Sequence, residues 1–142
     1  MMKHFIPLFL LTISPLFSLQ WQTNYDAACK QAKQENKPLV LLFTGSDWCT
    51  WCHKLEGEVL DTPQFSNEMG DKCIFVKLDF PRKHPIDSQT KAQNETLKNK
   101  FSIKGFPTIV VLDADQHLLG TTGYRSGGPS AYANHLENFL RK

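Results

Sequence analysis

The sequence predicts an α/β fold, in which a central mixed sheet of four to five strands is flanked by helices on both faces. Three apolar runs of strand length, at residues 39–44, 73–79 and 108–112, alternate with segments of helical composition. That alternation is typical of a sheet whose core strands are parallel. A weaker strand at residues 117–122 follows the last run after a short polar turn. These two strands predict a hairpin that adds an antiparallel edge to the sheet.

The N-terminal part of the domain predicts an edge strand and a helix. Residues 19–23 alternate weakly, as a short edge strand does. Residues 25–36 predict a helix because small and apolar side chains recur at helical spacing. This stripe consists of Tyr25, Ala28, Cys29 and Ala32. Asn24 is a suitable N-cap, and Pro38 cannot continue the helix.

The remaining elements follow from the lengths of the runs and from the residues that break them. Residues 39–44 form a continuous apolar run, which predicts a strand covered on both faces. A helix is expected from about residue 49 to residue 60, with a short helical turn at residues 64–69. The other expected segments are a polar loop at 80–91 and helices at 92–101 and 130–140.

Residues 1–18 predict a secretory signal peptide. A short basic start is followed by an apolar run at residues 5–17 and by the small residue Ser18. The run is shorter than the ~20 residues that a membrane helix needs, and an uncleaved anchor is the alternative. Cleavage after Ser18 would leave one domain, residues 19–142, in the periplasm or outside the cell. The later options for the cleavage site are Leu19 and Gln20.

The balance of charge gives no electrostatic reason to expect a nucleic acid or an anionic membrane as partner. The 142 residues hold 16 Lys and Arg against 14 Asp and Glu, a net charge of +2. Loss of the signal peptide would remove one lysine and no acid. The basic run at residues 82–84 lies beside two prolines and predicts a solvated loop. The length is enough for one domain, and we expect a monomer without nucleic acid.

All four cysteines lie beyond the predicted signal peptide, and an exported protein meets an oxidising compartment. Cys29 and Cys73 each lie on the apolar stripe of their element. Two interpretations remain open for them. They are either buried thiols that behave as small apolar side chains, or the two halves of a structural disulfide.

Cys49 and Cys52 are separated by two residues at the expected start of a helix. Unpaired backbone N–H groups at a helix start favour an anion, and the thiolate is the reactive form of cysteine. Cys49 is therefore expected to attack a substrate disulfide and form a mixed disulfide. Cys52, one turn further into the helix, would then attack Cys49 and release the reduced substrate.

The Cys-x-x-Cys-His motif at residues 49–53 permits two other interpretations. C-x-x-C-H is also the pattern of covalent haem attachment, with His53 as the axial ligand. Small c-type cytochromes are helical, whereas this motif follows a buried strand in an alternating chain. A structural zinc site usually has four close ligands, and the chain offers a single C-x-x-C pair. We therefore expect neither a metal nor a cofactor other than the redox-active disulfide itself.

Two motifs resemble those of the thioredoxin superfamily. Residues 48–52 read Trp-Cys-Thr-Trp-Cys after an apolar strand, and residues 105–108 read Gly-Phe-Pro-Thr before a later strand. Residues 43–53 are more closely similar to the exported thioredoxin-like proteins of Dsb type. The resemblance covers nearly all of residues 20–142 and implies a thioredoxin fold.

The resemblance also implies the residues that shape the site. The proline at the position of Pro107 is cis in this family and faces the cysteine pair, and Phe106 would offer its backbone to a substrate chain. Without the cysteine pair, a trans proline at the start of a strand would be the better interpretation. The other residues expected to shape the site are Trp48, Thr50, Trp51 and His53. For His53, stabilising a thiolate and simply facing solvent are both open.

The chain departs from thioredoxin at one buried position. Thioredoxin has an aspartate on the central strand, six residues before the first cysteine, and this chain has Phe43 there. The group that accepts the proton of Cys52 is therefore open. Lys77 and Glu56 are the candidates, and a solvated charge is the simpler interpretation of both.

The resemblance further implies a protein-disulfide reductase that acts on exported proteins. Such an enzyme needs electrons, so a membrane electron donor of DsbD type is implied as partner. An oxidase or isomerase with the same cysteine pair is the first alternative. A haem- or metal-binding module and a non-enzymatic interaction domain are the alternatives of another class.

Overall fold

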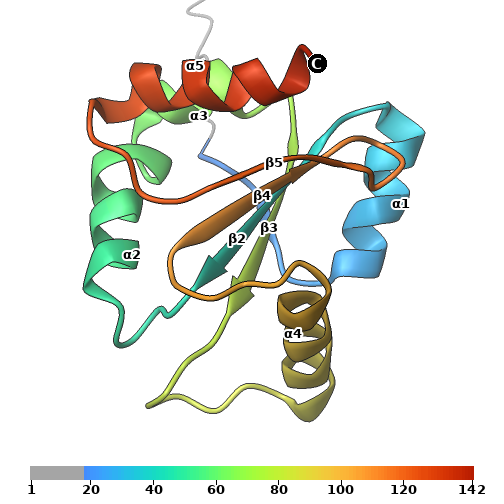
Figure 1. Ribbon diagram of the computed structural model, residues 1–142, viewed down its shortest axis with the longest axis vertical. Helices are drawn as coiled ribbons and strands as arrows, with labels where there is room; N and C mark the ends of the chain where they lie inside the picture. The colour runs from blue at the N-terminus through green and yellow to red at the C-terminus, as the bar shows by residue number, and fades with distance from the viewer. Residues whose placement is uncertain (1–17) are drawn as a thin grey trace, which may run out of the picture.

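The computed structural model describes residues 18–142, which form a five-stranded sheet enclosed by helices (Figure 1). The strands are β1 (Trp21–Gln22), β2 (Leu39–Thr44), β3 (Ile74–Asp79), β4 (Thr108–Leu112) and β5 (Leu118–Thr122). The α-helices are α1 (Tyr25–Glu35), α2 (Thr50–Leu55), α3 (Pro63–Met69), α4 (Ser88–Lys100) and α5 (Gly128–Leu140). A π-helical turn, η1 (Glu56–Leu60), continues α2. The α/β class and the mixed sheet predicted from the sequence are confirmed.

The strand order is β1-β3-β2-β4-β5, with β2 in the middle. β1 and β2 run parallel to β3, whereas β4 runs antiparallel to β2 and to β5. The expectation of a parallel core with an antiparallel edge was wrong in one respect, because the antiparallel pairing reaches the central strand. The reason lies in α4, which lies at one end of the sheet in Figure 1 and so lets β4 start beside the end of β2.

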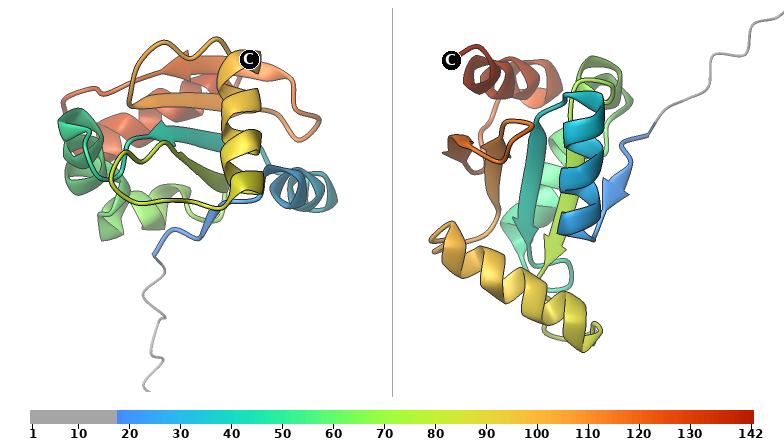
Figure 2. Two further views of the ribbon diagram at one scale, coloured as in Figure 1. Left: turned by 90° about the horizontal axis from the view of Figure 1, so that it is seen from below. Right: turned by 90° about the vertical axis from the view of Figure 1, so that its right-hand side faces the viewer.

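The sheet has a hydrophobic cluster on each face. On one face, residues of α2, η1, α3 and α5 pack against Val40, Leu42 and Phe75. On the other face, residues of α1 and α4 pack against Leu41 and Phe43. Figure 2 shows this arrangement from two further sides. Alternate residues of β2 therefore point to opposite helix layers, as the pleat requires.

Local signals place the helix boundaries. The side chain of Asn24 accepts a hydrogen bond from the N–H of Ala27 and caps α1, as predicted. α4 starts at Ser88, four residues before the expected start, because Asp87 caps it by accepting from the N–H of Thr90 at 2.8 Å. The predicted helix to residue 60 exists, but its second half widens into the π-helical turn.

The start of the described chain belongs to the domain. Leu19 is buried in the cluster under α3, and β1 pairs with β3 as an edge strand. The predicted signal peptide falls on residues 1–17, outside the described residues, and on Ser18, the first described residue. Between residues 18 and 142, no helix combines the length and the apolar composition needed to cross a bilayer.

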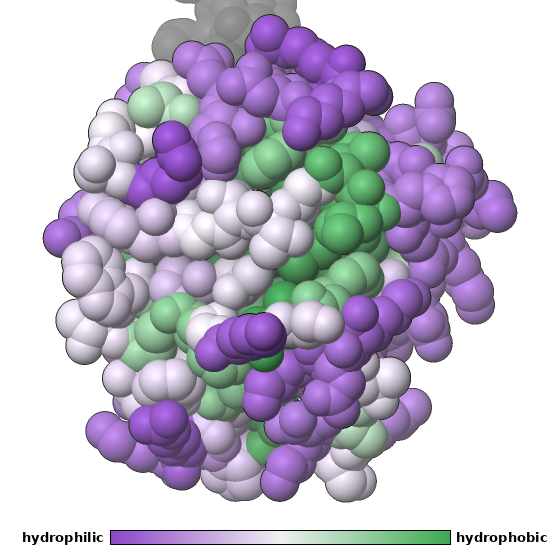
Figure 3. Space-filling model, in the orientation of Figure 1, coloured by the Kyte–Doolittle hydropathy of each residue, from purple (hydrophilic) through white to green (hydrophobic). Residues whose placement is uncertain are grey.

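Figure 3 shows an apolar strip beside the β4–β5 hairpin, with residues of intermediate hydropathy on one side of it and hydrophilic residues around it. Leu118 of β5 is 59% exposed, and Trp51 of α2 is 54% exposed. These are the exposed large hydrophobic residues of the described chain.

Candidate active site

A tight turn between β2 and α2 places the first cysteine at the start of a helix. The carbonyl oxygen of Gly45 accepts hydrogen bonds from the N–H groups of Trp48 (3.3 Å) and Cys49 (3.0 Å). The indole of Trp48 folds back over Gly45, where a Cβ would collide with the ring. A glycine is therefore required for this turn, which brings Cys49 back to the end of the central strand.

Cys49 and Cys52 are joined by a disulfide, with 5.2 Å between their Cα atoms. Cys49 is the N-cap of α2, and its Sγ accepts a hydrogen bond from the N–H of Cys52 at 3.2 Å. Cys49 is 5% exposed and Cys52 is 1% exposed. The two sulfurs are thus unequal in the way predicted, since the outer one lies at the helix start.

The Phe106–Pro107 peptide bond is cis, which is the isomer that the resemblance implies. Pro107 is buried and immediately precedes β4. Because Phe43 of β2 pairs with Thr108, the next residue of β2, Thr44, lies opposite Pro107. Pro107 is two residues before Ile109, which packs on the α2 face. The pleat therefore puts Pro107 on the same face as the disulfide.

Three aromatic rings support this edge of the site. The ring centroids of Trp48 and Phe106 are 5.7 Å apart, and those of Phe80 and Phe106 are 5.1 Å apart. The indole N–H of Trp48 donates to the carbonyl oxygen of Phe80 at 2.7 Å. Trp48 and Phe106, both predicted from the sequence, are thereby in contact. Phe80 was missed because nothing in the sequence marks it.

Asp47 ties the loop after β3 to the active-site turn. Its carboxylate accepts hydrogen bonds from the backbone N–H groups of Arg82 (2.9 Å), Lys83 (2.6 Å) and His84 (3.0 Å). These bonds, with that from Arg82 first, hold the pKa of Asp47 below its usual value. The guanidinium of Arg82 lies 3.7 Å from the centre of the Trp48 ring, a cation–π contact. The basic run expected to be a solvated loop is exposed, but it is anchored beside the site.

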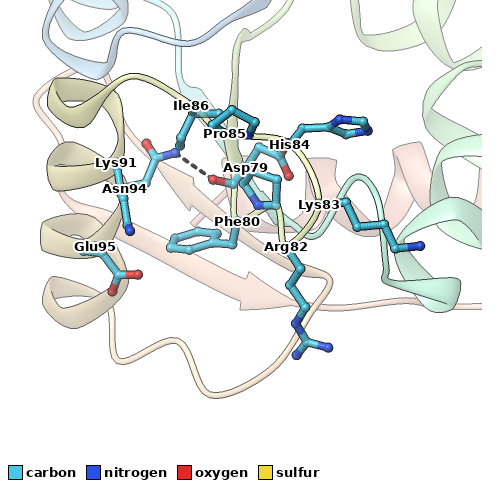
Figure 4. Close-up of a pocket in the computed structure, with 11 residues that line it drawn as sticks. Asp79, Phe80, Arg82, Lys83, His84, Pro85, Ile86, Lys91, Asn94 and Glu95 are labelled. Atoms are coloured by element: carbon cyan, nitrogen blue, oxygen red, sulfur yellow. Dashed lines mark hydrogen bonds between the residues drawn. The ribbon is translucent and has the colours of Figure 1, made fainter.

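A cavity of about 460 Å³ lies between this loop and α4 (Figure 4). Lys91, Asn94 and Glu95 line it from α4, and the amide of Asn94 donates to the carbonyl oxygen of Asp79 at 2.9 Å. Neither cysteine of the pair lines this cavity. Two of its lining residues, Phe80 and Arg82, contact Trp48, which precedes Cys49 in the chain.

Trp51 forms the opposite rim of the site. Its ring centroid is 5.1 Å from that of Tyr124, and the ammonium of Lys54 lies 4.9 Å from the Trp51 ring. The hydroxyl of Tyr124 donates to Glu58 at 2.5 Å, and this bond is the main cause that raises the pKa of Tyr124. Thr50, the other residue between the cysteines, is exposed. An exposed aromatic surface therefore adjoins the disulfide on the side away from Trp48.

His53 is exposed, as one of its two interpretations expected, and its ring is hydrogen-bonded to the active-site turn. Its Nε2 is 2.6 Å from the carbonyl oxygen of Ser46. A carbonyl oxygen only accepts, so Nε2–H donates this bond. His53 thus braces the turn that leads into α2. The side chain and the N–H of Ser46 both donate to Asp79, which fixes the same turn from β3.

The position of Phe43 differs from what residue counting indicated. Its ring packs on the α1 and α4 face, 6.3 Å from Phe80 and 6.4 Å from Phe101. It therefore lies on the face of the sheet opposite to the disulfide. Leu42 and Thr44 point to the α2 face instead. Counting back from the cysteine failed because the length of the turn decides which strand residue faces the helix.

Glu56 and Lys77, predicted separately as proton-transfer candidates, form an ion pair. Lys77 Nζ lies 3.3 Å from Glu56 Oε1, and the two side chains are 30% and 17% exposed. The ammonium of Lys77 also lies 5.0 Å from the ring of Trp21. The pair lies on the α2 face, since Lys77 is opposite Leu42 across β2 and β3. The solvated-charge interpretation is thus wrong in that both side chains are partly buried and paired.

Cys29 and Cys73 are free and buried. They belong to the two different clusters, on opposite faces of the sheet, so no disulfide joins them. Desolvation raises the pKa of Cys73 to about 12 and also raises the pKa of Cys29. The buried-thiol interpretation therefore fits this structure.

The haem and zinc interpretations both require the sulfurs of Cys49 and Cys52 to be free. The sulfurs of Cys49 and Cys52 are bonded to each other. Within residues 18–142, no three His, Cys, Asp or Glu side chains are grouped so that they could hold a metal ion.

Comparison with known proteins defines the family. A family model described as "Thioredoxin-like domain" matches residues 25–139. The chain belongs to this thioredoxin-like family. Together with the disulfide-bonded C-x-x-C pair at the helix start, this makes it a thiol–disulfide oxidoreductase of Dsb type.

Within that class, the chain is similar to one characterised relative over most of its length. It is 36% identical over 124 residues to the disulfide bond reductase DsbH of Chlamydia pneumoniae, covering 87% of this chain and 74% of that protein. A solved structure of a DsbH oxidoreductase matches with a TM-score of 0.85 and 34% identity, over 93% of this chain and 92% of that one. The C-terminal domain of DsbD from Neisseria meningitidis shares the fold, with a TM-score of 0.61, 21% identity, and coverage of 80% and 91%.

Proposed function

We propose that this protein is an exported disulfide reductase that reduces disulfides in other exported proteins. The observation that carries the proposal is the Cys49–Cys52 disulfide at the start of α2, beside the buried Pro107. The similarity to a disulfide bond reductase over most of the chain supports the direction. The apolar run at residues 5–17 supports export through a cleaved signal peptide, which would leave the protein in the periplasm or outside the cell.

The reaction proceeds by two thiol–disulfide exchanges. The thiolate of Cys49 attacks one sulfur of the substrate disulfide, forms a mixed disulfide and releases the first substrate thiolate. Cys52, as its thiolate, then attacks the Cys49 sulfur, and the second substrate sulfur leaves as a thiolate that takes up the proton released from Cys52. The protein is left oxidised, so a thiol donor must reduce it again. A membrane donor of DsbD type is the partner that we propose.

The surroundings of the disulfide are suited to an extended polypeptide. Phe106 offers its backbone beside Pro107, and Trp51 with Tyr124 offers an exposed aromatic surface on the other rim. An aromatic surface next to the reactive sulfur binds apolar side chains through the hydrophobic effect. Trp48 and Phe106 support the opposite rim, and we propose that a monomer carries the complete site.

Two measurements on the purified mature domain test the proposal. The wild-type protein should catalyse the reduction of insulin by dithiothreitol, and Cys52→Ser should instead accumulate a mixed disulfide with the substrate. Equilibration with glutathione should give a reduction potential near that of thioredoxin, about −270 mV. A potential near that of DsbA, about −120 mV, would support the oxidase alternative and overturn the proposed direction.

A further inference from the structure

The side-chain hydroxyl of Thr44 is buried in the oxidised protein and makes no hydrogen bond. The side chain is 0% exposed, and its Oγ1 has no hydrogen-bond partner. Among residues 18–142, no other buried side-chain nitrogen or oxygen is left without a partner. The remaining buried polar residues, Ser66 and Asn94, both make hydrogen bonds. A buried hydroxyl without a partner destabilises the folded protein, so its presence calls for a reason.

The strand register places this hydroxyl beneath the active site. Thr44 is the last residue of β2, and its side chain points to the same face as Leu42. In the row across the sheet it lies between Asp79 of β3 and Pro107, the residue before β4. Both carboxylate oxygens of Asp79 accept from Ser46, and Pro107 has no N–H. Neither neighbour in the row supplies a partner.

The packing of α2 brings the inner cysteine over the same row. Leu55 of α2 and Val59 of η1 pack on the sheet with Leu42 and Val40. Cys52 is one turn before Leu55 on the same side of the helix and is 1% exposed. Because α2 runs back over the sheet from the end of β2, its first helical turn, which contains Cys52, lies above the last residue of the strand. Cys52 is therefore the buried cysteine that α2 directs toward the sheet at this end of β2.

We propose that the Thr44 hydroxyl donates a hydrogen bond to the sulfur of Cys52 when the disulfide is open, and so stabilises the attacking thiolate. In the oxidised protein the Cys52 sulfur is held in its bond to Cys49, and the Thr44 hydroxyl has no hydrogen-bond partner. Opening the disulfide frees the Cys52 sulfur to carry a negative charge. A hydrogen bond to a charged group is stronger than one between neutral groups. Thr44 is a positioning residue in this account, because it acts through Cys52.

The charged groups that face this region are the Glu56–Lys77 ion pair and Asp79. Lys77 pairs with Leu42, two residues before Thr44 along β2, and Glu56 is four residues after Cys52. The ion pair is satisfied internally, and Asp79 is turned to Ser46. The hydroxyl is thus the uncommitted polar group at the end of the strand. The proposal rests on the proposed thiol exchange but not on its direction in the cell.

The test measures the attack of Cys52 on the mixed disulfide, and it compares a variant without the Thr44 hydroxyl with one that keeps it. Reduced protein is mixed with 5,5′-dithiobis(2-nitrobenzoate) in a stopped-flow instrument. The first thionitrobenzoate reports attack by Cys49, and the second reports attack by Cys52 on the mixed disulfide. Thr44→Val keeps the shape and removes the hydroxyl, whereas Thr44→Ser keeps the hydroxyl. We expect the second release to be about tenfold slower in Thr44→Val and within about threefold of wild type in Thr44→Ser.

A second readout is the equilibrium with glutathione. Without the hydroxyl, the equilibrium constant with glutathione should shift about tenfold toward the oxidised protein. This shift lowers the reduction potential by about 30 mV. The oxidised Thr44→Val protein should melt no lower than wild type, since an unpartnered hydroxyl is replaced by a methyl group. Thr44→Ala, which also lacks the hydroxyl, should show the same slow second release if Thr44→Val does not fold.

Two outcomes would overturn the inference. One is a second release in the hydroxyl-free variants that stays within twofold of wild type. The other is an equally slow release in Thr44→Ser, which would assign the effect to packing. Failure of wild-type protein to reduce insulin, with a normal second release, would instead count against the proposed reductase function alone.

Discussion

The four cysteines fall into two pairs that are almost equally buried and yet chemically opposite. Cys49 and Cys52 are 5% and 1% exposed, and Cys29 and Cys73 are 6% and 3% exposed. The first pair forms a disulfide at the start of α2, where backbone N–H groups converge. The second pair is divided between the two faces of the sheet and consists of free thiols.

The comparison shows that burial alone does not decide what a cysteine does. Desolvation without a compensating dipole keeps Cys73 protonated, with its pKa raised to about 12. A helix start supplies donors to sulfur, as the N–H of Cys52 does for Cys49. The difference in function between the pairs therefore comes from backbone geometry and from the distance between the two sulfurs.

The largest expected effect comes from replacing one cysteine of the disulfide pair, compared with the same replacement in the free pair. Cys49→Ser should reduce insulin-disulfide reduction to the uncatalysed rate, because a serine hydroxyl does not attack disulfides at neutral pH. Cys29→Ser is the matched control and should keep near-wild-type activity. Equal losses in both variants would mean that the two pairs do not differ in function.

The Glu56–Lys77 pair tests whether a charged group serves Cys52. If Glu56 accepts the proton of Cys52, Glu56→Gln should slow the second thionitrobenzoate release by about tenfold or more at pH 7. The difference should shrink at alkaline pH, where Cys52 ionises without help. Glu35→Gln, at the end of α1 and paired with Lys37 at 3.4 Å, is the control. A pH-independent loss in Glu56→Gln would indicate a structural role.

The raised pKa of Cys73 predicts a loss of stability in alkali. The thiol stays protonated in the folded state up to about pH 12, whereas in the unfolded chain it ionises near its ordinary pKa of about 8.5. Stability is thus unaffected below about pH 8.5 and falls as the pH rises toward 12. Between neutral pH and pH 10, the wild-type protein should lose about 2 kcal/mol of unfolding free energy through this thiol. Cys73→Ala should be less stable at neutral pH, but it should not show this loss at pH 10. Urea unfolding at several pH values measures it, and parallel curves for the two proteins would contradict the assignment.

The smallest expected effect concerns the loop that Asp47 holds. Asp47→Asn replaces a carboxylate that accepts from three backbone N–H groups, so Arg82 should lose its fixed place on Trp48. We expect KM for a protein disulfide to rise by about three- to fivefold with little change in kcat, since the chemistry at sulfur is untouched. The loop should also be cut faster by trypsin. Asp115→Asn, in the β4–β5 turn, is the control and should change neither quantity.

The lowered pKa of Asp47 gives the same loop a pH dependence. The carboxylate form holds the three N–H groups, so the arrangement is intact at neutral pH and is lost as the pH falls through the lowered pKa. Faster trypsin cutting of wild type than of Asp47→Asn at neutral pH would contradict this role.

The strands and the cysteine pair were predictable because each leaves a local signal, whereas the role of Pro107 followed from the family resemblance. Apolar runs mark buried strands, two cysteines at a helix start mark a redox pair, and a capped stripe marks α1. Arg82, Tyr124 and Phe80 left no such signal, because each reaches the site from a loop or strand end far from it in sequence. Asp47 was within the active-site segment, but its three partners are more than thirty residues away.

The sequence by itself determined the α/β class, the order of the elements and the identity of the reacting sulfurs, because these depend on periodicity and spacing over a few residues. The tertiary structure alone decided which face each residue of β2 meets, since the length of the turn at Gly45 sets the offset between strand and helix. It placed Phe43 on the α1 and α4 face, away from the disulfide, and Thr44 on the α2 face. It also paired Glu56 with Lys77 and separated Cys29 from Cys73, because packing of distant segments, and not local chemistry, fixes those distances.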